Sequence, residues 1–259
     1  MSRIDKVFKK GSTALIAYVT VGYPSLEATM EVVPLLEHWG CDIVELGIPF
    51  SDPLADGGTI QQASDAALGK GVTSQRCLEI AGELRRKTDM PLVFMTYFNP
   101  VMHYGLDKFC HSSRQAGIDG LIIPDLPPEE GSELESASRK HGLDLIYLLA
   151  PTSTGARIRL VSGRSRGFIY LVSTTGTTGA REKLSAELPG FVSRVRKITG
   201  LPLCVGFGIS TPEQAGEVAA FADGVIVGSR IIQLLSAGDD YSSLGEFVKG
   251  LRRALDERG

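Results

Sequence analysis

The sequence predicts one α/β domain, spanning residues 1–259, folded as a (β/α)8 TIM barrel with an extra helix at its N-terminus. Eight short runs of β-branched and other apolar residues alternate with helical stretches along the chain. That alternation indicates parallel strands joined by crossover helices. The length of 259 residues is also near that of one such barrel. No linker, low-complexity tract or long charge run divides the sequence.

The eight strand candidates are nearly all apolar, as strands covered by helices on both faces must be. They lie at residues 15–20, 43–46, 92–95, 120–123, 145–149, 168–172, 203–205 and 224–227. An open, doubly wound sheet is the competing architecture. Eight similar units in this length, with no large break in composition, favour closure into a barrel.

Helical patterns separate these strands. They lie at residues 26–39, 74–87, 129–141, 154–165, 188–199 and 211–221. Ser25 precedes the first pattern, and Ser210 or Thr211 opens the last. A serine or threonine oxygen at such a position can accept a hydrogen bond from an unpaired amide of the first helical turn.

Composition and charge exclude several classes of protein. Hydrophobic residues make up 43% and charged residues 22%, which is typical of a globular chain and too apolar for a disordered one. A formal net charge of -3 predicts no general attraction to nucleic acid or to anionic membranes. Residues 2–10 place Ile4, Val7 and Phe8 on one side of a charged helix, which predicts a cover for the barrel floor and no secretory signal. Because no apolar run reaches membrane-spanning length, we expect a cytoplasmic protein.

The cysteines and histidines form no pattern that predicts a metal or a disulfide framework. The cysteines are scattered, without a Cys-x-x-Cys pair or histidines at ligand spacing, so we expect reduced core residues and no bound metal. They are Cys41, Cys77, Cys110 and Cys204. The histidines lie mostly in polar helical stretches, where solvated side chains are expected. They are His38, His103, His111 and His141.

Three glycine-rich turns late in the chain have the composition of a phosphate site. They follow the sixth, seventh and eighth strands, at residues 173–179, 206–210 and 228–230. Glycine lets backbone amides approach an anion closely, and hydroxyl groups and helix N-termini add favourable interactions. Any one of these glycines could simply form a tight turn. Three such turns in adjacent loops favour a phosphorylated small molecule at the barrel mouth, and the longer fingerprint of a dinucleotide site is missing.

Two carboxylic acids belong to the same rim of the predicted barrel. Glu45 lies inside the otherwise apolar second strand, where its side chain should point into the barrel. Burial raises the pKa of an acid, so such a group can both give and take a proton near pH 7. A buried acid paired with a base elsewhere or with a backbone amide is the alternative. In the loop that follows, we choose Asp56 as the second acid, because Asp52 next to Pro53 is a typical turn-former.

The stretch Glu45-Leu-Gly-Ile-Pro-Phe-Ser-Asp-Pro-Leu-Ala-Asp-Gly57 resembles the signature of the tryptophan synthase alpha subunit family almost residue for residue. The resemblance spans the chain and continues at residues 20–24, 95–100 and 124–127 and in the three glycine turns. It implies a lyase of tryptophan biosynthesis that cleaves indole-3-glycerol phosphate into indole and glyceraldehyde 3-phosphate. The reaction implied is a retro-aldol cleavage without a covalent nucleophile.

The resemblance also implies a role for individual residues. Glu45 matches the general acid–base, and Asp56 matches the acid that interacts with the indole N–H group. The residues that match the phosphate site are Gly179, Gly208, Gly228 and Ser229. The residues that match the indole pocket are Tyr18, Met95, Ile122 and Tyr170, together with Tyr97 near the two acids. Without the resemblance, aromatic and aliphatic residues at these places are more often simply barrel core.

A partner is implied as well. Relatives in the family assemble with a beta subunit that carries pyridoxal phosphate, in a complex of two alpha and two beta subunits, so we expect this chain itself to bind no cofactor. Residues 49–56, 97–100 and 124–127 match the regions that meet that partner. Residues 173–182 match a loop that closes over substrate, which we expect to be poorly ordered without ligand.

Three other functions remain open from the residues alone. A sugar-phosphate isomerase or epimerase would share the three glycine turns. It would not need the acidic loop, which is the segment 49–58 that carries Asp52 and Asp56. A non-catalytic subunit would only activate the beta subunit through its rim. A standalone lyase would release indole without needing a partner.

Overall fold

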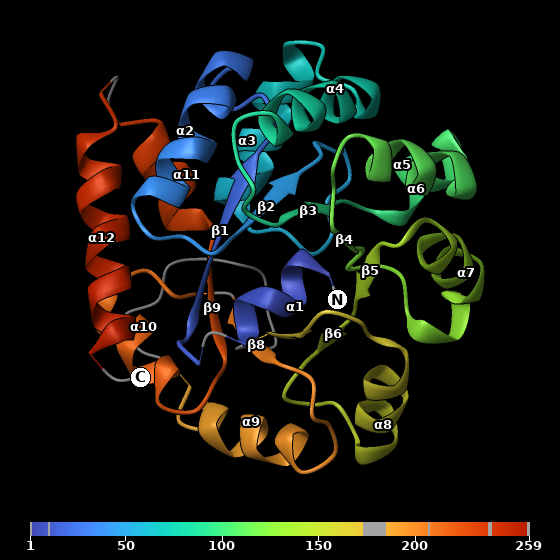
Figure 1. Cartoon of the computed structure of the whole chain (residues 1–259), viewed down its shortest axis with the longest axis vertical. Helices are drawn as coiled ribbons and strands as arrows, with labels where there is room; N and C mark the ends of the chain where they lie inside the picture. Colours follow the sequence, from blue (N-terminus) through green and yellow to red (C-terminus); the bar gives the residue numbers. More distant parts are fainter. Residues whose placement is uncertain (1, 10, 173–184, 207, 238–239, 258–259) are drawn as a thin grey trace.

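A computed structural model describes residues 2–9, 11–172, 185–206, 208–237 and 240–257 of the chain. Within them, nine parallel strands form one sheet in the order β5-β4-β3-β2-β1-β9-β8-β7-β6, surrounded by helices (Figure 1). The strands are β1 Ala14–Thr20, β2 Ile43–Gly47, β3 Leu92–Met95, β4 Gly120–Ile122, β5 Asp144–Ile146, β6 Leu148–Leu149, β7 Ile169–Val172, β8 Leu203–Gly206 and β9 Gly224–Val227.

The sheet is a barrel of eight strands whose fifth strand is divided. β5 pairs with β4, β6 pairs with β7, and Tyr147 alone separates β5 from β6. The Tyr147 amide donates to Ser165 Oγ at 3.0 Å instead of to a neighbouring strand, while its carbonyl accepts from the Tyr170 amide at 3.1 Å. The predicted barrel is therefore confirmed, and β5 and β6 together correspond to the fifth predicted strand.

The helices of the described residues are α1 Arg3–Phe8, α2 Leu26–His38, α3 Gly58–Gly69, α4 Ser74–Arg85, α5 Phe98–Tyr104, α6 Leu106–Gln115, η1 Pro128–Glu130, α7 Ser132–His141, α8 Gly155–Arg164, α9 Leu188–Arg196, α10 Pro212–Ala219, α11 Ser229–Leu235 and α12 Ser242–Asp256. Each predicted pattern matches one of them to within a few residues, whereas α3, α5, α6, α11 and α12 had no predicted pattern. The predicted helix at 129–141 is divided at Gly131. Ser25 caps α2, and Thr211, rather than Ser210, caps α10.

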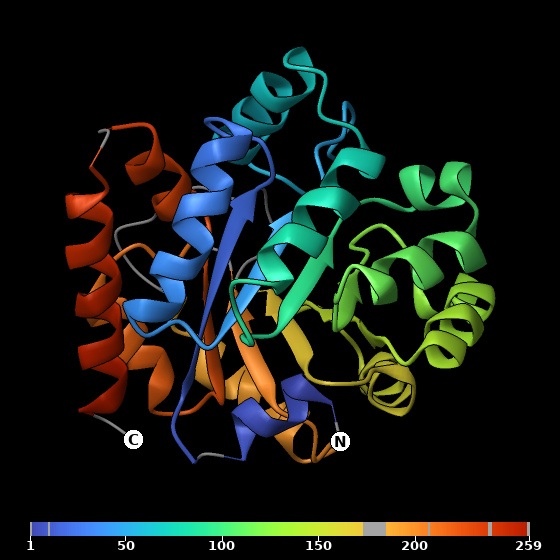
Figure 2. The ribbon, with the colours of Figure 1, turned by 45° about the horizontal axis from the view of Figure 1, so that its top comes forward.

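The predicted floor helix is present as α1, which lies across the barrel at the N-terminal ends of the strands (Figures 1 and 2). Ser2 and Asp5 cap it reciprocally, each side chain bonding to the other residue's amide. Ile4 is fully buried. A Cβ atom on Gly120 or Gly167 would lie 3.1 or 3.2 Å from the Ile4 side chain, so these glycines leave the space that Ile4 fills.

Three aspartates at the floor join neighbouring strands. Each directly precedes a strand, and its carboxylate accepts a hydrogen bond from an amide near the start of the next strand in the sheet. The bonds run from the amides of Leu15, Leu92 and Leu203 to Asp42, Asp119 and Asp223, at 2.9, 3.1 and 2.7 Å. An arginine from a surrounding helix pairs with each carboxylate: Arg252, Arg85 and Arg196, respectively. These carboxylates satisfy amides that the parallel ladder leaves unpaired.

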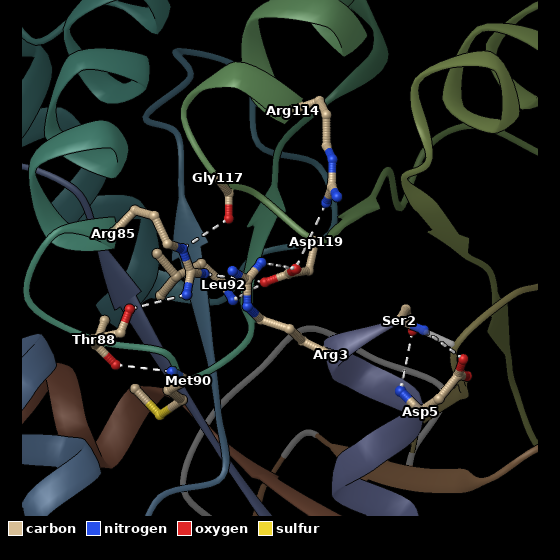
Figure 3. A network of polar contacts seen from close by, with 10 residues as sticks. All are labelled: Ser2, Arg3, Asp5, Arg85, Thr88, Met90, Leu92, Arg114, Gly117 and Asp119. Carbon is tan, nitrogen blue, oxygen red and sulfur yellow. Dashed lines mark hydrogen bonds and ion pairs between the residues drawn. The ribbon is translucent and has the colours of Figure 1, made fainter.

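Asp119 has the largest set of partners among the three (Figure 3). Its side chain is 2% exposed and accepts from Arg85 Nη2 at 3.1 Å and from Arg3 Nη1 at 3.0 Å. Arg114 Nη1 lies 3.9 Å away. One carboxylate therefore connects α1, α4 and α6 to the starts of β3 and β4.

The remaining sequence expectations concern cysteines, histidines and membrane spans. All four cysteines are buried and free, as predicted. His38, His103 and His111 are exposed, whereas His141 is partly buried, with Nε2 2.9 Å from Asp107 Oδ1. Within the described residues, no helix combines the length and apolar character needed to cross a membrane.

Replacing Asp119 by alanine tests the floor network. The change leaves the Leu92 amide and the 14%-exposed Arg85 side chain without this acceptor. We expect a loss of about 3–5 kcal/mol in the free energy of unfolding, measured in urea, because one member of a buried ion pair is removed. The matched control is Asp107→Ala, whose carboxylate is 59% exposed beside Lys140, so its removal should cost much less. Equal losses in the two variants would contradict this role of Asp119.

Candidate active site

Strand register places the predicted pocket residues inside the barrel with Glu45. Tyr18 pairs with Glu45 across β1 and β2, and Met95 pairs with both Gly47 and Ile122 across β2, β3 and β4. Paired residues of neighbouring strands share a face, and residues two apart on one strand do so too. The same face of β7 carries Tyr170, whose hydroxyl group interacts electrostatically with Glu45 across the barrel.

Two glycines make room for the tyrosines. A Cβ atom on Gly47 would lie 2.1 Å from Tyr18 Oη, and one on Gly206 would lie 2.2 Å from Tyr170 Oη. The two rings therefore lie across the ends of neighbouring strands, in space that any other residue would fill. That Gly47 and Gly206 leave room for these rings was not predicted from the sequence. A glycine that ends the strand beside an inward-facing tyrosine was the available signal.

Glu45 is a buried acid without a polar partner. Its side chain is fully buried, and neither Oε1 nor Oε2 has a hydrogen-bond partner among the described residues. No described base pairs with it, which leaves the alternative of a structural ion pair without support. Burial raises the pKa of Glu45 to about 8, so the carboxyl group is mostly protonated at neutral pH.

Asp56 is brought to the same site by the loop after β2. The Asp56 amide donates to Pro53 O at 3.1 Å, and Gln61 Nε2 on α3 donates to Asp56 O at 2.8 Å. Burial raises the pKa of Asp56 to about 6, while a hydrogen bond from Tyr97 acts in the opposite direction. Asp56 is therefore mostly ionised at neutral pH. Asp52, by contrast, is exposed, and its carbonyl accepts from the Leu54 amide, as expected of a turn residue.

Tyr97 lies directly against the acidic loop. The residue is 3% exposed, and its hydroxyl oxygen accepts a hydrogen bond from the Ala55 amide at 3.0 Å. Its ring packs against Phe50, with 5.4 Å between ring centroids. The structure thus places Tyr97 beside Asp56, at the carboxyl end of β3, the strand that carries Met95.

The tyrosines inside the barrel supply neutral hydroxyl groups. The pKa of Tyr18 is raised well above its usual value by burial and by the nearby charge of Asp56. The pKa of Tyr170 is raised by burial and then by Glu45. Both hydroxyl groups remain protonated, so the site contains one neutral carboxyl group, one carboxylate and neutral phenols. Such a set can transfer a proton and stabilise a positive charge without a metal. Among the described residues, no three potential metal ligands lie together.

Two of the three glycine turns are described, and they lie at one rim. β8 and β9 are neighbours in the sheet; Gly208 follows β8, and Gly228 and Ser229 follow β9 at the start of α11. Gly208 has φ of 83°, which favours glycine. A Cβ atom on Gly228 would lie 3.3 Å from the Tyr18 side chain, so packing also favours glycine there. Gly179 and the predicted lid at 173–182 lie outside the described residues.

Comparison with known proteins identifies one consistent group of relatives. A profile described as tryptophan synthase alpha chain matches residues 4–250. The tryptophan synthase alpha chain of Dehalococcoides mccartyi is 57% identical over 99% of this chain and 100% of its own length. That of Citrifermentans bemidjiense is 50% identical over 98% of both chains. A solved structure of Mycobacterium tuberculosis tryptophan synthase has a TM-score of 0.92 and 40% identity, covering 98% of each chain.

The unpartnered carboxyl group of Glu45 makes stability depend on pH. The pKa of Glu45 rises from 4.5 to about 8 on folding. Its contribution to the free energy of unfolding is therefore fully present below pH 4.5 and is lost as pH rises through 8. The loss is about 1.4 kcal/mol for each pH unit within that window. Glu45→Gln removes the titration. The variant should therefore gain several kcal/mol relative to the wild type between pH 5 and pH 8, measured by urea unfolding. A difference independent of pH would show that Glu45 titrates normally.

Proposed function

This chain belongs to the tryptophan synthase alpha chain family, and from that premise we propose that it cleaves indole-3-glycerol phosphate into indole and glyceraldehyde 3-phosphate. Membership gives it a lyase role in tryptophan biosynthesis. The observation that carries the specific activity is the pair of buried acids with different proton affinities. The pKa of Glu45 is about 8 and that of Asp56 is about 6, so near pH 7 one is a proton donor and the other is charged.

The proposed reaction uses Glu45 twice. Its proton is first transferred to C3 of the indole ring, and the positive charge that forms is stabilised by Asp56 near the ring N–H group. The resulting Glu45 carboxylate then takes the proton of the hydroxyl group on the carbon attached to C3. As that carbon becomes an aldehyde, its bond to C3 breaks, and the bonding electrons restore the neutral indole ring. Glu45 regains its proton, so the cycle needs no oxidant, reductant or cofactor of its own.

The phosphate group of the substrate is proposed to bind at the rim of the barrel where the glycine turns lie. Gly208, Gly228 and Ser229 are proposed to bind it through backbone amides and one hydroxyl group, with Gly179 as the fourth residue. Their position after β8 and β9, the seventh and eighth strands of the barrel, is where barrels frequently bind phosphate. Tyr18, Met95, Ile122 and Tyr170 would then hold the indole ring between this rim and the two acids.

The partner is proposed to be a beta subunit that carries pyridoxal phosphate, in a complex of two alpha and two beta subunits. Leu54 and Met102 support this proposal: they are 85% and 57% exposed, and are the large hydrophobic side chains exposed among the described residues. Leu54 lies in the acidic loop, and Met102 lies on α5, which begins within the matching segment 97–100. Their place in or next to the segments that match the partner-contacting regions, and not exposure alone, is what supports a docking surface there. The free, buried cysteines suit the cytoplasm, where we place the protein.

The pH dependence of indole release tests the activity. We expect kcat/KM to rise as pH passes about 6 and to fall as it passes about 8, since Asp56 must be ionised and Glu45 protonated. Glu45→Gln should lower the rate by at least about 100-fold. Asp144→Asn, in a buried acid at the barrel floor, is the matched control and should retain the wild-type rate. Isomerisation of a pentose phosphate without any indole release would support the competing enzyme class instead.

Binding of the beta subunit tests the docking surface. Leu54→Asp places a charge where an apolar side chain should be buried, so we expect affinity to fall by about 10-fold or more in calorimetry. The control is Arg159→Asp on the exposed side of α8, which should bind normally. Unchanged affinity of Leu54→Asp would remove this loop from the interface. Indole release that the beta subunit does not accelerate would indicate a standalone lyase.

A further inference from the structure

The hydroxyl group of Tyr97 connects two neighbouring residues of the acidic loop. It accepts a hydrogen bond from the Ala55 amide at 3.0 Å, which places it beside the next residue, Asp56, with whose charge it interacts. A phenol has one proton to give. Because the amide can only donate, it occupies a lone pair of the Tyr97 oxygen and leaves the phenolic proton for the carboxylate. The phenolic proton is therefore available to the neighbouring Asp56 carboxylate.

The surrounding residues hold this hydroxyl group in place. The Tyr97 ring is buried against Phe50, from the same loop as Asp56. The next residue, Phe98, donates its amide to Asp125 Oδ1 at 2.9 Å, which ties the start of α5 to the segment after β4. Rotation of the ring or movement of its backbone would therefore break packing as well as polar contacts. A donor fixed in this way needs little reorganisation when charge develops at the site.

Comparison of the two acids shows what this donor does. Both are at least nine-tenths buried, and burial raises the pKa of each. Glu45 has no donor among the described residues, whereas Asp56 has Tyr97. Asp56 Oδ1 has no described partner, so one carboxylate oxygen remains available to a ligand. Among the described residues, the other ionisable groups that interact with Asp56 or Tyr97 are Tyr18 from β1, Tyr170 from β7 and Asp125 from the segment after β4.

We propose that Tyr97 is a positioning residue, whose hydroxyl group keeps the Asp56 carboxylate charged and leaves its second oxygen free to accept a hydrogen bond from the substrate. This inference rests on the proposed function for its catalytic meaning. Tyr97 would then act on Asp56 in addition to lining the proposed pocket.

The test is Tyr97→Phe, which keeps the ring against Phe50 and removes only the hydroxyl group. We expect the acid limb of the kcat/KM profile to move about one pH unit towards alkaline values, because the ionised form of Asp56 loses its donor. The rate at pH 6 should fall about 5-fold, with a much smaller change at pH 8. The control is Tyr147→Phe, which removes another buried hydroxyl group, bonded to Glu135 at 2.8 Å outside the site. That variant should leave the limb in place.

A second readout separates this inference from the proposed function. The carboxyl resonance of Asp56 can be followed by NMR in the full unliganded chain with 13C-labelled aspartate, and assigned by its absence in Asp56→Asn. A higher titration midpoint in Tyr97→Phe than in the wild type would support the inference even if the wild-type chain released no indole. An unchanged midpoint would overturn it, whatever the activity. A loss of rate that is equal at pH 6 and pH 8 would also overturn it.

Discussion

Closure of the barrel is the constraint on which the candidate site depends. In the sheet order, β2 and β7 are separated by β1, β9 and β8, so an open sheet would keep Glu45 and Tyr170 far apart. The divided fifth strand closes the ring, since β5 continues the pairing from β4 and β6 carries it to β7. The inner faces then converge, and Tyr170 interacts electrostatically with Glu45 across the interior. The aspartates at the floor hold the starts of the strands that this convergence requires.

Buried carboxyl groups at the floor and in the interior of the barrel differ in how their charge is compensated. At the floor, Asp119 is surrounded by arginines and an amide, so its charge is fully compensated. In the interior, Glu45 has no such partner, and burial favours the form that carries a proton. A compensated carboxylate such as Asp119 stabilises the fold. An uncompensated one costs stability at high pH and remains available for proton transfer, which suits a catalytic group.

Much of this arrangement was predictable from local sequence, because strands buried on both faces must be apolar and Glu45 breaks that rule. The inward-facing positions of Tyr18, Met95, Ile122 and Tyr170 agree with the period of two along each strand, whereas their assignment to an indole pocket came from the family resemblance. Other features depend on contacts between distant segments. The break at Tyr147 requires Ser165 from the following αβ turn, and the room for Tyr170 requires Gly206 on the next strand. The bond between Tyr97 and the Ala55 amide has no sequence pattern that would indicate it.

The paired glycines and tyrosines have a consequence for the range of ligands that this barrel can accept. Gly47 and Gly206 lie behind the rings of Tyr18 and Tyr170, so the depth of the cavity is set partly by atoms that no ligand would reach. Adding a methyl group at either glycine would push a phenol towards the centre and shrink the cavity. Shortening the tyrosine in front would enlarge it while leaving the strand backbone alone. Redesign for bulkier or smaller ligands would therefore change each glycine together with its tyrosine.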